Sequence, residues 1–498
     1  MRSISSKNRK KGLRVLKVCC ALTLLLCVSG MTLEGKEDAI ETFSLEECVT
    51  VALKNSFEVK KAKLDLYIAE TDRMYSEAVF DTVLYGGASY LDDKRQQLSV
   101  FASDDNQTNS YYAGLKKTFL TGTEVSAELS DQRSWNNTEF TSKNPAHEVE
   151  GMVTLVQPLA KNGLGYIDRG NLSLTRMSIE NAGLDEQDRI EGVISQVEKA
   201  YIGLVHATES LNIYKEMLKR SEELNETDKK NLEIGLTEKV DLIASEANLL
   251  RIKAEYNISE NDLEKARANL KLLMNIGSEK GLEAIEGIRL KEPHVDLEGC
   301  LKEAFMRRRD YLVAKKEIEI KGLNLKIKKN NTLPEVDVSL SMAVNGLEGD
   351  LTEAVRKTTG GDNTYYLAGI EVEIPLDNRD ALSQKIKAEH EKEKALITLK
   401  ETERAIITEI GNAFGDMKAL KESILYSDKA VELEEKKLAE EEKRFKYGRS
   451  NTKKIIDYQR DILNVKLENA VFIQKYNSAV IDLNRTMNVT LDKYKDML

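Results

Sequence analysis

The sequence predicts a mixed α/β fold that is mainly helical, in which two copies of a long antiparallel helical hairpin each carry a group of strands. Three observations lead to this prediction. A stretch that begins at Gly235 recurs at Gly448 without a gap. Apolar residues recur every seven positions before both glycines. The 498 residues include only 5 prolines, and none of them falls in the segments where long helices are expected.

The duplication extends over whole helices rather than a short motif. Upstream of the glycines, Ala200-Tyr201 corresponds to Ala413-Phe414. From the glycines onward, identical residues stand at identical spacing: Gly235, Leu250, Glu255, Ala266, Leu270, Met274 and Asn275 in the first copy, and Gly448, Leu463, Glu468, Ala479, Leu483, Met487 and Asn488 in the second.

A seven-residue apolar period precedes each glycine. Its members are Val197, Leu204, Leu211, Leu218 and Leu232 in the first copy, and Met417, Ile424, Val431, Leu438 and Phe445 in the second. Only Asn225 interrupts the first series. A period of seven sustained over this length is typical of a coiled-coil interface.

Gly235 and Gly448 each lie between two helical segments, where a glycine can adopt the left-handed conformation that ends many helices. We therefore expect helical hairpins over residues 166–275 and 380–488, each with its tip at a glycine. At about 1.5 Å per residue, the first helix of such a hairpin would be on the order of 100 Å long.

The N-terminal residues 1–30 have the features of a secretory signal peptide. Basic residues precede an apolar run from Val18 to Val28, and small residues follow it. The run is short for a bilayer span, so a retained anchor is the second interpretation. Cys27 raises the alternative of lipidation, although a lipoprotein signal normally has a small residue where Leu26 stands.

The rest of the chain divides into two structural repeats, residues 31–292 and 293–498. Each repeat opens with a pair of helices, expected over 44–79 and 297–329, the first starting at a predicted Ser44–Glu47 capping box. Matching positions in these helices carry the two remaining cysteines, Cys48 and Cys300. Each most simply fills a small buried site, and a disulfide between them is the alternative.

Strands are expected at 83–156 and 336–374. Aliphatic residues alternate with Asp and Ser from Val336 to Val344, and with Gly and Glu from Tyr366 to Ile374. This alternation is typical of a barrel wall between lipid and water, and also of a soluble antiparallel sheet with one solvent-exposed face.

The first strand region contains an additional predicted hairpin, residues 111–130, between polar stretches at 92–109 and 131–146 that we expect to be loops. Both strand regions close on a proline, in Gln157-Pro158-Leu159 and Ile374-Pro375-Leu376. Pro158 and Pro375 therefore mark the expected junctions between strands and helices.

Composition argues against several function classes. The net charge of -10 and the lack of a basic stripe with interleaved aromatics argue against nucleic acid as a partner. The four histidines are scattered without ligand spacing, so no metal or other cofactor is expected. No phosphate-binding loop or nucleophile elbow is present, which argues against an enzyme.

The order, spacing and duplication of these elements resemble the TolC family of outer-membrane channel-tunnel proteins, over essentially the whole mature chain. The resemblance implies a homotrimer in which each protomer gives four strands to a twelve-stranded transmembrane β-barrel and long helices to a periplasmic α-barrel tunnel. Physics independently requires an oligomer, because four strands cannot close a barrel and open edges are not tolerated in lipid. The hairpin over 111–130 departs from the family, either as an extracellular feature or as additional wall strands.

The resemblance also implies a periplasmic gate near the helical tips. Asp241 is similar to a family acid that ties neighbouring helices at the closed tip, and Asp457 is similar to one of two aspartates that ring the constriction. The second ring position is Lys454, which departs from the acidic pattern and argues against strong cation selectivity.

We hypothesise that Lys454 and Asp457 form salt links across the threefold axis and hold the tip shut at low ionic strength. The alternative is that both are solvated charges on a helix surface. The turns at Gly235 and Gly448 would be the docking site of an adaptor hairpin, or else plain helix C-caps.

The function implied is a passive exit duct in the outer membrane for drug efflux or type I secretion. Its partners would be outer-membrane lipid, a periplasmic adaptor protein, and an inner-membrane pump or ABC exporter. The alternative is a structural or adaptor coiled-coil protein of the periplasm or cell surface, with a soluble sheet domain.

Overall fold

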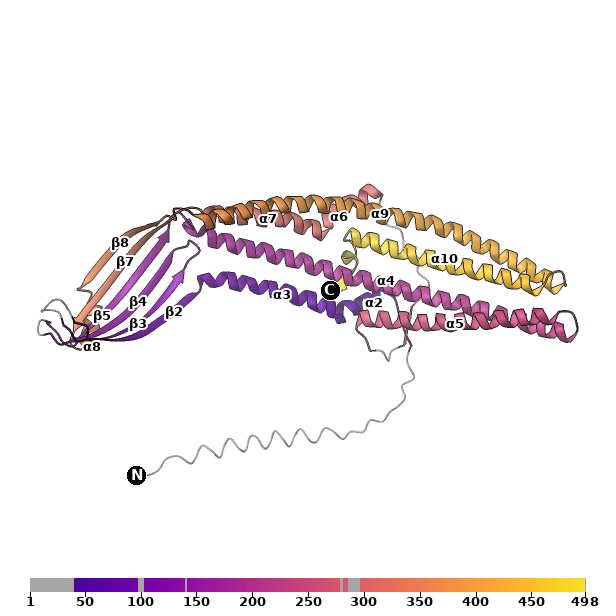
Figure 1. The fold of residues 1–498 in the computed structure, drawn as a ribbon, viewed down its shortest axis with the longest axis horizontal. Helices are drawn as coiled ribbons and strands as arrows, with labels where there is room; N and C mark the ends of the chain where they lie inside the picture. The colour runs from indigo at the N-terminus through magenta and orange to yellow at the C-terminus, as the bar shows by residue number, and fades with distance from the viewer. Residues whose placement is uncertain (1–39, 97–102, 139–140, 278–280, 285–295, 498) are drawn as a thin grey trace, which may run out of the picture.

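The computed structural model describes residues 40–96, 103–138, 141–277, 281–284 and 296–497. Figure 1 shows an elongated molecule with a β-sheet at one end and long helices that run from the sheet to two tips at the other end. The expected mainly helical fold is therefore confirmed. The predicted signal peptide over residues 1–30, including Cys27, lies outside the described residues.

The two long hairpins lie side by side. The first consists of α4 (Tyr166–Glu233) and α5 (Lys239–Met274), and the second of α9 (Arg379–Lys446) and α10 (Thr452–Thr486). The helices α4 and α9 both have 68 residues, which corresponds to about 100 Å each at the rise of an α-helix. The structure thus confirms the duplicated hairpins and their expected bounds to within a few residues.

Two shorter helices open each repeat, as expected. They are α2 (Leu45–Asn55) with α3 (Phe57–Glu77), and α6 (Leu297–Arg307) with α7 (Arg309–Asn330). The predicted capping box is present, because the Ser44 side chain accepts from the Glu47 amide and the Glu47 carboxylate accepts from the Ser44 amide. Cys48 and Cys300 are free and buried, each within the hydrophobic core of its own repeat.

The helices form one layer. Near the sheet the order of packed neighbours is α3, α4, α7 and α9, and toward the tips it is α5, α4, α10 and α9. Members of the seven-residue series, such as Val197, Leu204, Met417 and Leu438, are almost completely buried within the layer. A third core cluster, which includes Ile213, Ile252 and Ile462, packs the two hairpins together.

The sheet is antiparallel and has six strands in the order β2, β3, β4, β5, β7 and β8. The bounds are β2 (Thr82–Asp93), β3 (Asn106–Thr118), β4 (Glu124–Asn136), β5 (Ala146–Pro158), β7 (Glu335–Glu348) and β8 (Thr364–Glu373). The four strands per protomer implied by the family resemblance are therefore wrong for this chain. The additional hairpin, β3 with β4, lies inside the sheet between β2 and β5.

Part of the expected loops is strand. Of the expected loop residues, 92–93 belong to β2, 106–109 to β3, 131–136 to β4 and 146 to β5. These strand ends are polar on both faces, because Asn109 and Arg133 lie on the face that carries Leu115 and Leu129 nearer the helices. They therefore lack the alternation that predicts a strand, and composition indicated a loop.

Several further elements were not anticipated. The stretch between β7 and β8 contains a helix, α8 (Leu351–Gly360), capped by Asp350. Two short strands, β1 (Ile40–Phe43) and β6 (Gly281–Ala284), pair in parallel. Short 3-10 helices occupy Ala78–Phe80, Gly163–Gly165 and Leu491–Met497. Within the described residues, none of the helices has a stretch both long and apolar enough to cross a membrane.

Candidate functional site: the helical tips and the two-faced sheet

The tips of both hairpins turn at the predicted glycines. Gly235 has φ 74 and Gly448 has φ 70, the left-handed conformation that an L side chain rarely adopts. The amide of Leu236 donates to the Asn231 carbonyl at 2.7 Å, and the amide of Arg449 donates to the Arg444 carbonyl at 2.9 Å. These are the bonds of a Schellman C-cap, so the local prediction is confirmed at both tips.

The two predicted constriction residues lie one turn apart on α10 and have separate partners. Lys454 forms an ion pair with Glu441 of α9 at 3.0 Å, and Glu441 is nearly buried. Asp457 pairs with Arg460 on its own helix at 2.9 Å. Within one protomer, Lys454 therefore closes the second hairpin near its tip, and Asp457 is part of an exposed helix surface.

Asp241 lies in the first turn of α5. It accepts a hydrogen bond from the Thr237 hydroxyl at 3.3 Å. Among the described residues of one protomer it forms no ion pair. The bond to Thr237 stabilises the turn after Gly235.

A buried carboxyl that the sequence did not single out, Asp228 of α4, joins the two hairpins close to the tips. It has no exposed surface, and the Thr452 hydroxyl at the start of α10 donates to it at 2.9 Å. Burial raises the pKa of Asp228 more than the hydrogen bonds from Thr452 and Ser245 lower it. The available signal was the run of polar residues, including Asn225, where the apolar series was expected to continue.

Ion pairs continue this connection along the hairpins. Lys466 of α10 pairs with Glu216 of α4 and with Glu435 of α9, both at 2.9 Å, so one ammonium group links three helices. Burial disfavours the charged form of Glu216, but Lys466 and Arg220 outweigh it and hold the pKa of this carboxyl below its ordinary value. Arg220 in turn reaches Glu442 of α9 at 3.1 Å.

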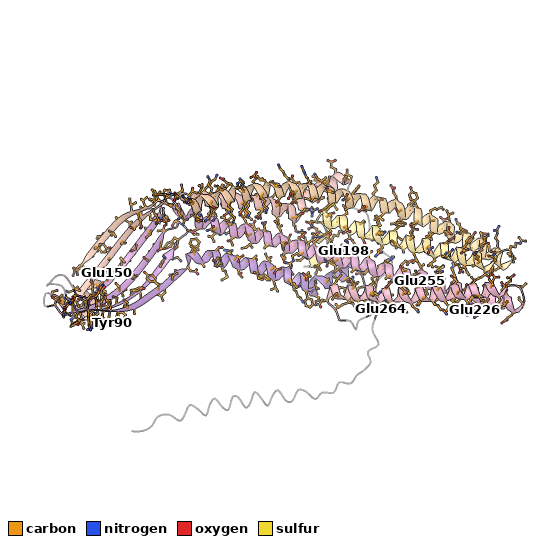
Figure 2. All side chains as sticks on the ribbon, viewed as in Figure 1. Tyr90, Glu150, Glu198, Glu226, Glu255 and Glu264 are labelled. Carbon is orange, nitrogen blue, oxygen red and sulfur yellow. The ribbon has the colours of Figure 1, made fainter. Side chains whose placement is uncertain are left out.

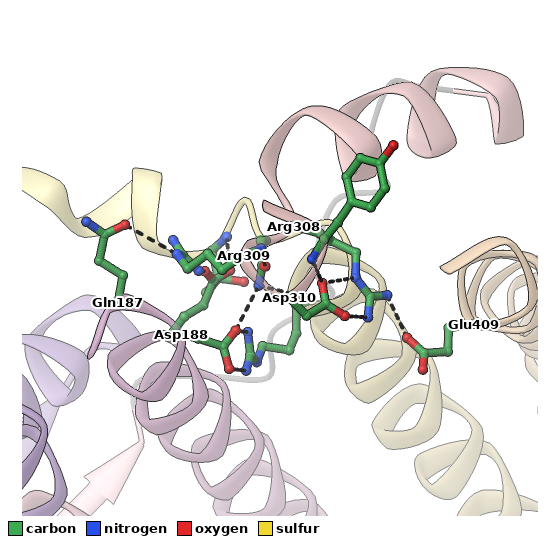
Figure 3. Close-up of polar contacts among 11 residues, drawn as sticks. Gln187, Asp188, Arg308, Arg309, Asp310 and Glu409 are labelled. Atoms are coloured by element: carbon green, nitrogen blue, oxygen red, sulfur yellow. Dashed lines mark hydrogen bonds and ion pairs between the residues drawn. The ribbon is translucent and has the colours of Figure 1, made fainter. Parts of the chain in front are cut away.

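A second polar cluster joins the repeats midway along the rod (Figure 3). Arg309, at the start of α7, forms an ion pair with Glu191 of α4, and both side chains are almost fully buried. Glu191 also accepts from the Thr490 amide at 2.9 Å. Arg485 of α10 holds Asp188 through two contacts of 2.7 and 2.8 Å. This cluster fixes the two repeats to each other at mid-length, as the buried contact between Asp228 and Thr452 does near the tips.

The sheet has two chemically different faces. Residues opposite each other across a ladder point to the same face, and the rows on one face are apolar. One such row is Leu84, Leu115, Ala127, Val153, Met342 and Tyr366. Most of these side chains are at least half exposed in the protomer, Leu84 and Tyr366 by 75%.

The opposite face is polar. It carries Glu124, Glu128, Glu150, Asp337, Glu371 and Glu373 among Ser, Thr, Gly and Tyr residues. Figure 2 shows Glu150 of this face and Tyr90 of the apolar face at the end of the sheet far from the helices, and Glu226 near the tips. The predicted alternation is thus confirmed, and Pro158 and Pro375 lie where the sheet meets the helices, as expected.

The described residues contain no cluster of His, Cys, Asp and Glu able to hold a metal ion. Residues 300–489 match the family model of the outer membrane efflux proteins. The TolC-like resemblance is confirmed. The match covers most of the second repeat, from α6 to the end of α10, and it supports the outer-membrane location that the resemblance implies.

Solved structures of outer-membrane channels share most of the fold. The Campylobacter jejuni CmeC channel has 16% sequence identity and a TM-score of 0.69, with 91% of this chain and 89% of that one covered. Vibrio cholerae VceC has 16% identity and a TM-score of 0.67, with 89% and 95% covered. The open state of Neisseria gonorrhoeae MtrE has 14% identity and a TM-score of 0.63, with 90% and 89% covered.

Sequence comparison with curated proteins gives no match. At 13–18% identity the structures establish the fold alone, but they extend it to the first repeat, which the family model does not reach. The efflux-protein fold thus spans both repeats.

Proposed function

We propose that this protein is an outer-membrane exit duct, in which several copies close a transmembrane barrel from their sheets and a periplasmic tunnel from their helices. The observation that carries the proposal is the two-faced sheet joined directly to helices of about 100 Å. The apolar face suits lipid and the polar face suits a water-filled lumen. Such a duct moves solutes passively and has no need of a catalytic site.

Both lateral sides of the protomer are left without partners. On one side are β2 and α3, and on the other are β8 and α9 (Figure 1). The α3 side exposes large apolar residues that a neighbouring copy would cover: Phe57, Leu64, Tyr67, Ile68, Met74 and Tyr75. The α9 side exposes Leu382, Ile386, Ile397 and Ile407. These patches cover the part of the rod nearer the sheet, where a neighbouring copy would bury them.

The two sides differ, so contacts between copies are head to tail and generate a closed ring when the rotation closes. We propose a ring of three copies, the number implied by the family resemblance. The tips point away from the membrane, where an adaptor protein and an inner-membrane pump or ABC exporter would dock at the turns of Gly235 and Gly448.

We further propose that the tips form the gate. In the closed ring, Lys454 and Asp457 of the three copies would approach the axis, where they would exchange their present partners, Glu441 and Arg460, for contacts between copies. Asp241 would tie neighbouring helices. The arrangement supports this because α10 carries both charges on the turn that follows the tip.

The soluble coiled-coil alternative is less well supported. It leaves the apolar face of six strands without a cover, apart from α8, which packs on one end of it through Thr358 and Val149. An exposed apolar face of this size is an aggregation hazard in water.

The decisive experiment is to fractionate cells, extract the protein in detergent and determine its mass by light scattering, followed by single-channel recording in planar bilayers. The proposal expects a trimer from the outer membrane that conducts. A water-soluble monomer or dimer would refute it. For the gate, Lys454→Met with Asp457→Asn should raise the conductance and change ion selectivity, and unchanged values would contradict the ring of charges.

A further inference from the structure

The inserted hairpin β3–β4 runs the full height of the sheet. One row of paired residues crosses all six strands: Tyr85, Gly114, Glu128, Met152, Ala343 and Tyr365. The turn of the hairpin lies at the helix junction, where a Cβ on Gly122 would come within 3.2 Å of the Pro158 ring and 3.0 Å of the Gly165 nitrogen. The hairpin is therefore part of the wall rather than an appendage beyond it.

The faces of the hairpin agree with those of its neighbours. In β4, Val125, Ala127 and Leu129 lie on the apolar face, and Ser126, Glu128 and Ser130 lie on the polar face. An extracellular appendage has no need of a continuous apolar face in register with the membrane strands. A transmembrane strand pair does need one.

The edges of the sheet are compatible with closure between copies. β2 runs away from the helices and β8 runs back toward them, so β8 of one copy and β2 of the next would pair in the antiparallel manner. Each edge is unpaired in the protomer, and an unpaired edge in lipid leaves a row of unsatisfied amide and carbonyl groups.

The widths of the two parts of the protomer can be compared. Six strands about 4.8 Å apart and tilted by about 40° occupy roughly 38 Å of a barrel circumference. Four helices packed at about 8–10 Å occupy roughly 32–40 Å. Four strands would occupy only about 25 Å on the same geometry. The inserted hairpin therefore makes the sheet as wide as the helical layer that it continues.

We propose that three copies of this chain close an eighteen-stranded barrel, whose outlet is as wide as the helical tunnel and does not narrow it. This inference rests on the proposed trimeric duct. The circumference is about 1.5 times that of a twelve-stranded wall, and barrels of 16–18 strands enclose open aqueous channels. On this proposal the barrel does not act as the size filter of the duct.

The test introduces one cysteine at a time into the protein, which keeps its native cysteines. Leu129 and Ser130 are adjacent on the inserted hairpin and point to opposite faces. The native Cys48 and Cys300 have no exposed surface, and burial raises the pKa of both thiols, that of Cys48 to about 12. They give a low background with maleimides, which react with the thiolate.

In intact outer membranes, a charged maleimide added from outside should label Ser130→Cys at least tenfold faster than Leu129→Cys. Equal labelling of both residues would place the hairpin in water and overturn the proposal. A readout of pore width comes from Ser341→Cys, a polar-face position on β7. It is treated with maleimide-linked poly(ethylene glycol) of increasing length.

The matched control is the excision of residues 106–136, after which β2 and β5 would meet antiparallel with their faces in register. The longest polymer that labels Ser341→Cys should be clearly shorter in the excised variant than in the full-length chain. If the longest polymer that reacts is the same for the excised variant and the full-length chain, and both are trimeric by light scattering, the proposal of a wider barrel is overturned. A chain that is not trimeric at all refutes the proposed duct instead, so the two failures are distinguishable.

Discussion

Among the residues that the structure describes, Arg309 and Glu191 form the most deeply buried ion pair between the two repeats, with side-chain exposures of 8% and 0%. Arg309→Met should keep most of the packing of the side-chain stem, because methionine has a similar unbranched length. It removes the guanidinium and leaves the Glu191 carboxylate buried with one remaining bond, from the Thr490 amide. The perturbation is thus mainly electrostatic.

The expected loss of unfolding free energy is about 3–5 kcal/mol, the range for breaking a buried pair by removing one partner. Arg307 is the matched control. It lies two residues away with 42% of its side chain exposed, and its partners Glu303 and Asp492 are 39% and 33% exposed. Arg307→Met should therefore cost at most about 1 kcal/mol.

The assay is urea unfolding of the purified protein in detergent, followed by the circular dichroism of the helices. All variants are compared at equal protein concentration, because the stability of an oligomer depends on it. Adding Glu191→Gln to Arg309→Met should restore part of the loss, since glutamine keeps an acceptor for the Thr490 amide without a buried charge. Equal stabilities of Arg309→Met and Arg307→Met, or no rescue by glutamine, would refute the reasoning.

Three further outcomes are expected. Gly235→Ala should destabilise its hairpin by about 1 kcal/mol, because Gly235 has φ 74, which an L side chain rarely adopts. Gly183→Ala should instead stabilise α4 by about 0.5–1 kcal/mol, because Gly183 is helical and open space surrounds the position of the added Cβ. Thermal unfolding measures both effects. Lys466→Met should raise the open probability of single channels, whereas the exposed Lys436→Met should not; equal behaviour of the two would contradict the hairpin link. The pKa of Asp228 is raised in the folded protein, so this carboxyl binds more protons when the tip is folded. The protonation of Asp228 therefore stabilises the folded tip at low pH, and this stabilisation is lost as pH rises through the raised pKa. As pH rises, the rate of amide hydrogen exchange at the tip should increase by more than the intrinsic exchange rate of an unstructured chain does. Asp228→Asn should abolish this additional increase.

The local architecture of the chain could be predicted from its sequence. The seven-residue series predicts that Val197 and Met417 are buried, as they are in the structure. This prediction requires only the helical period and one neighbouring helix against which the residues pack. Gly235 and Gly448 mark the turns because the left-handed conformation depends on one residue and its immediate bonds. The two faces of the strands follow from a period of two.

The candidate site was only partly predictable. The positions of Lys454 and Asp457 near the tip follow from their distance from Gly448, but the pairing of Lys454 with Glu441 depends on how α9 and α10 face each other. Asp228 and Lys466 were missed because their partners lie more than 200 residues away in the sequence or on a third helix. A single polar residue in a helix does not reveal what it will meet.

The sequence by itself determined the duplication, the hairpins, their tips and the alternation of the strands, because each of these depends on periodicity and backbone preference within a short segment. Only the tertiary structure decided that the sheet has six strands, that β1 and β6 pair in parallel, and that α8 covers the far end of the sheet. Those features depend on which distant segments meet and in which register. A polar stretch such as residues 131–136 becomes strand rather than loop only when a neighbouring strand is present to satisfy its backbone hydrogen bonds.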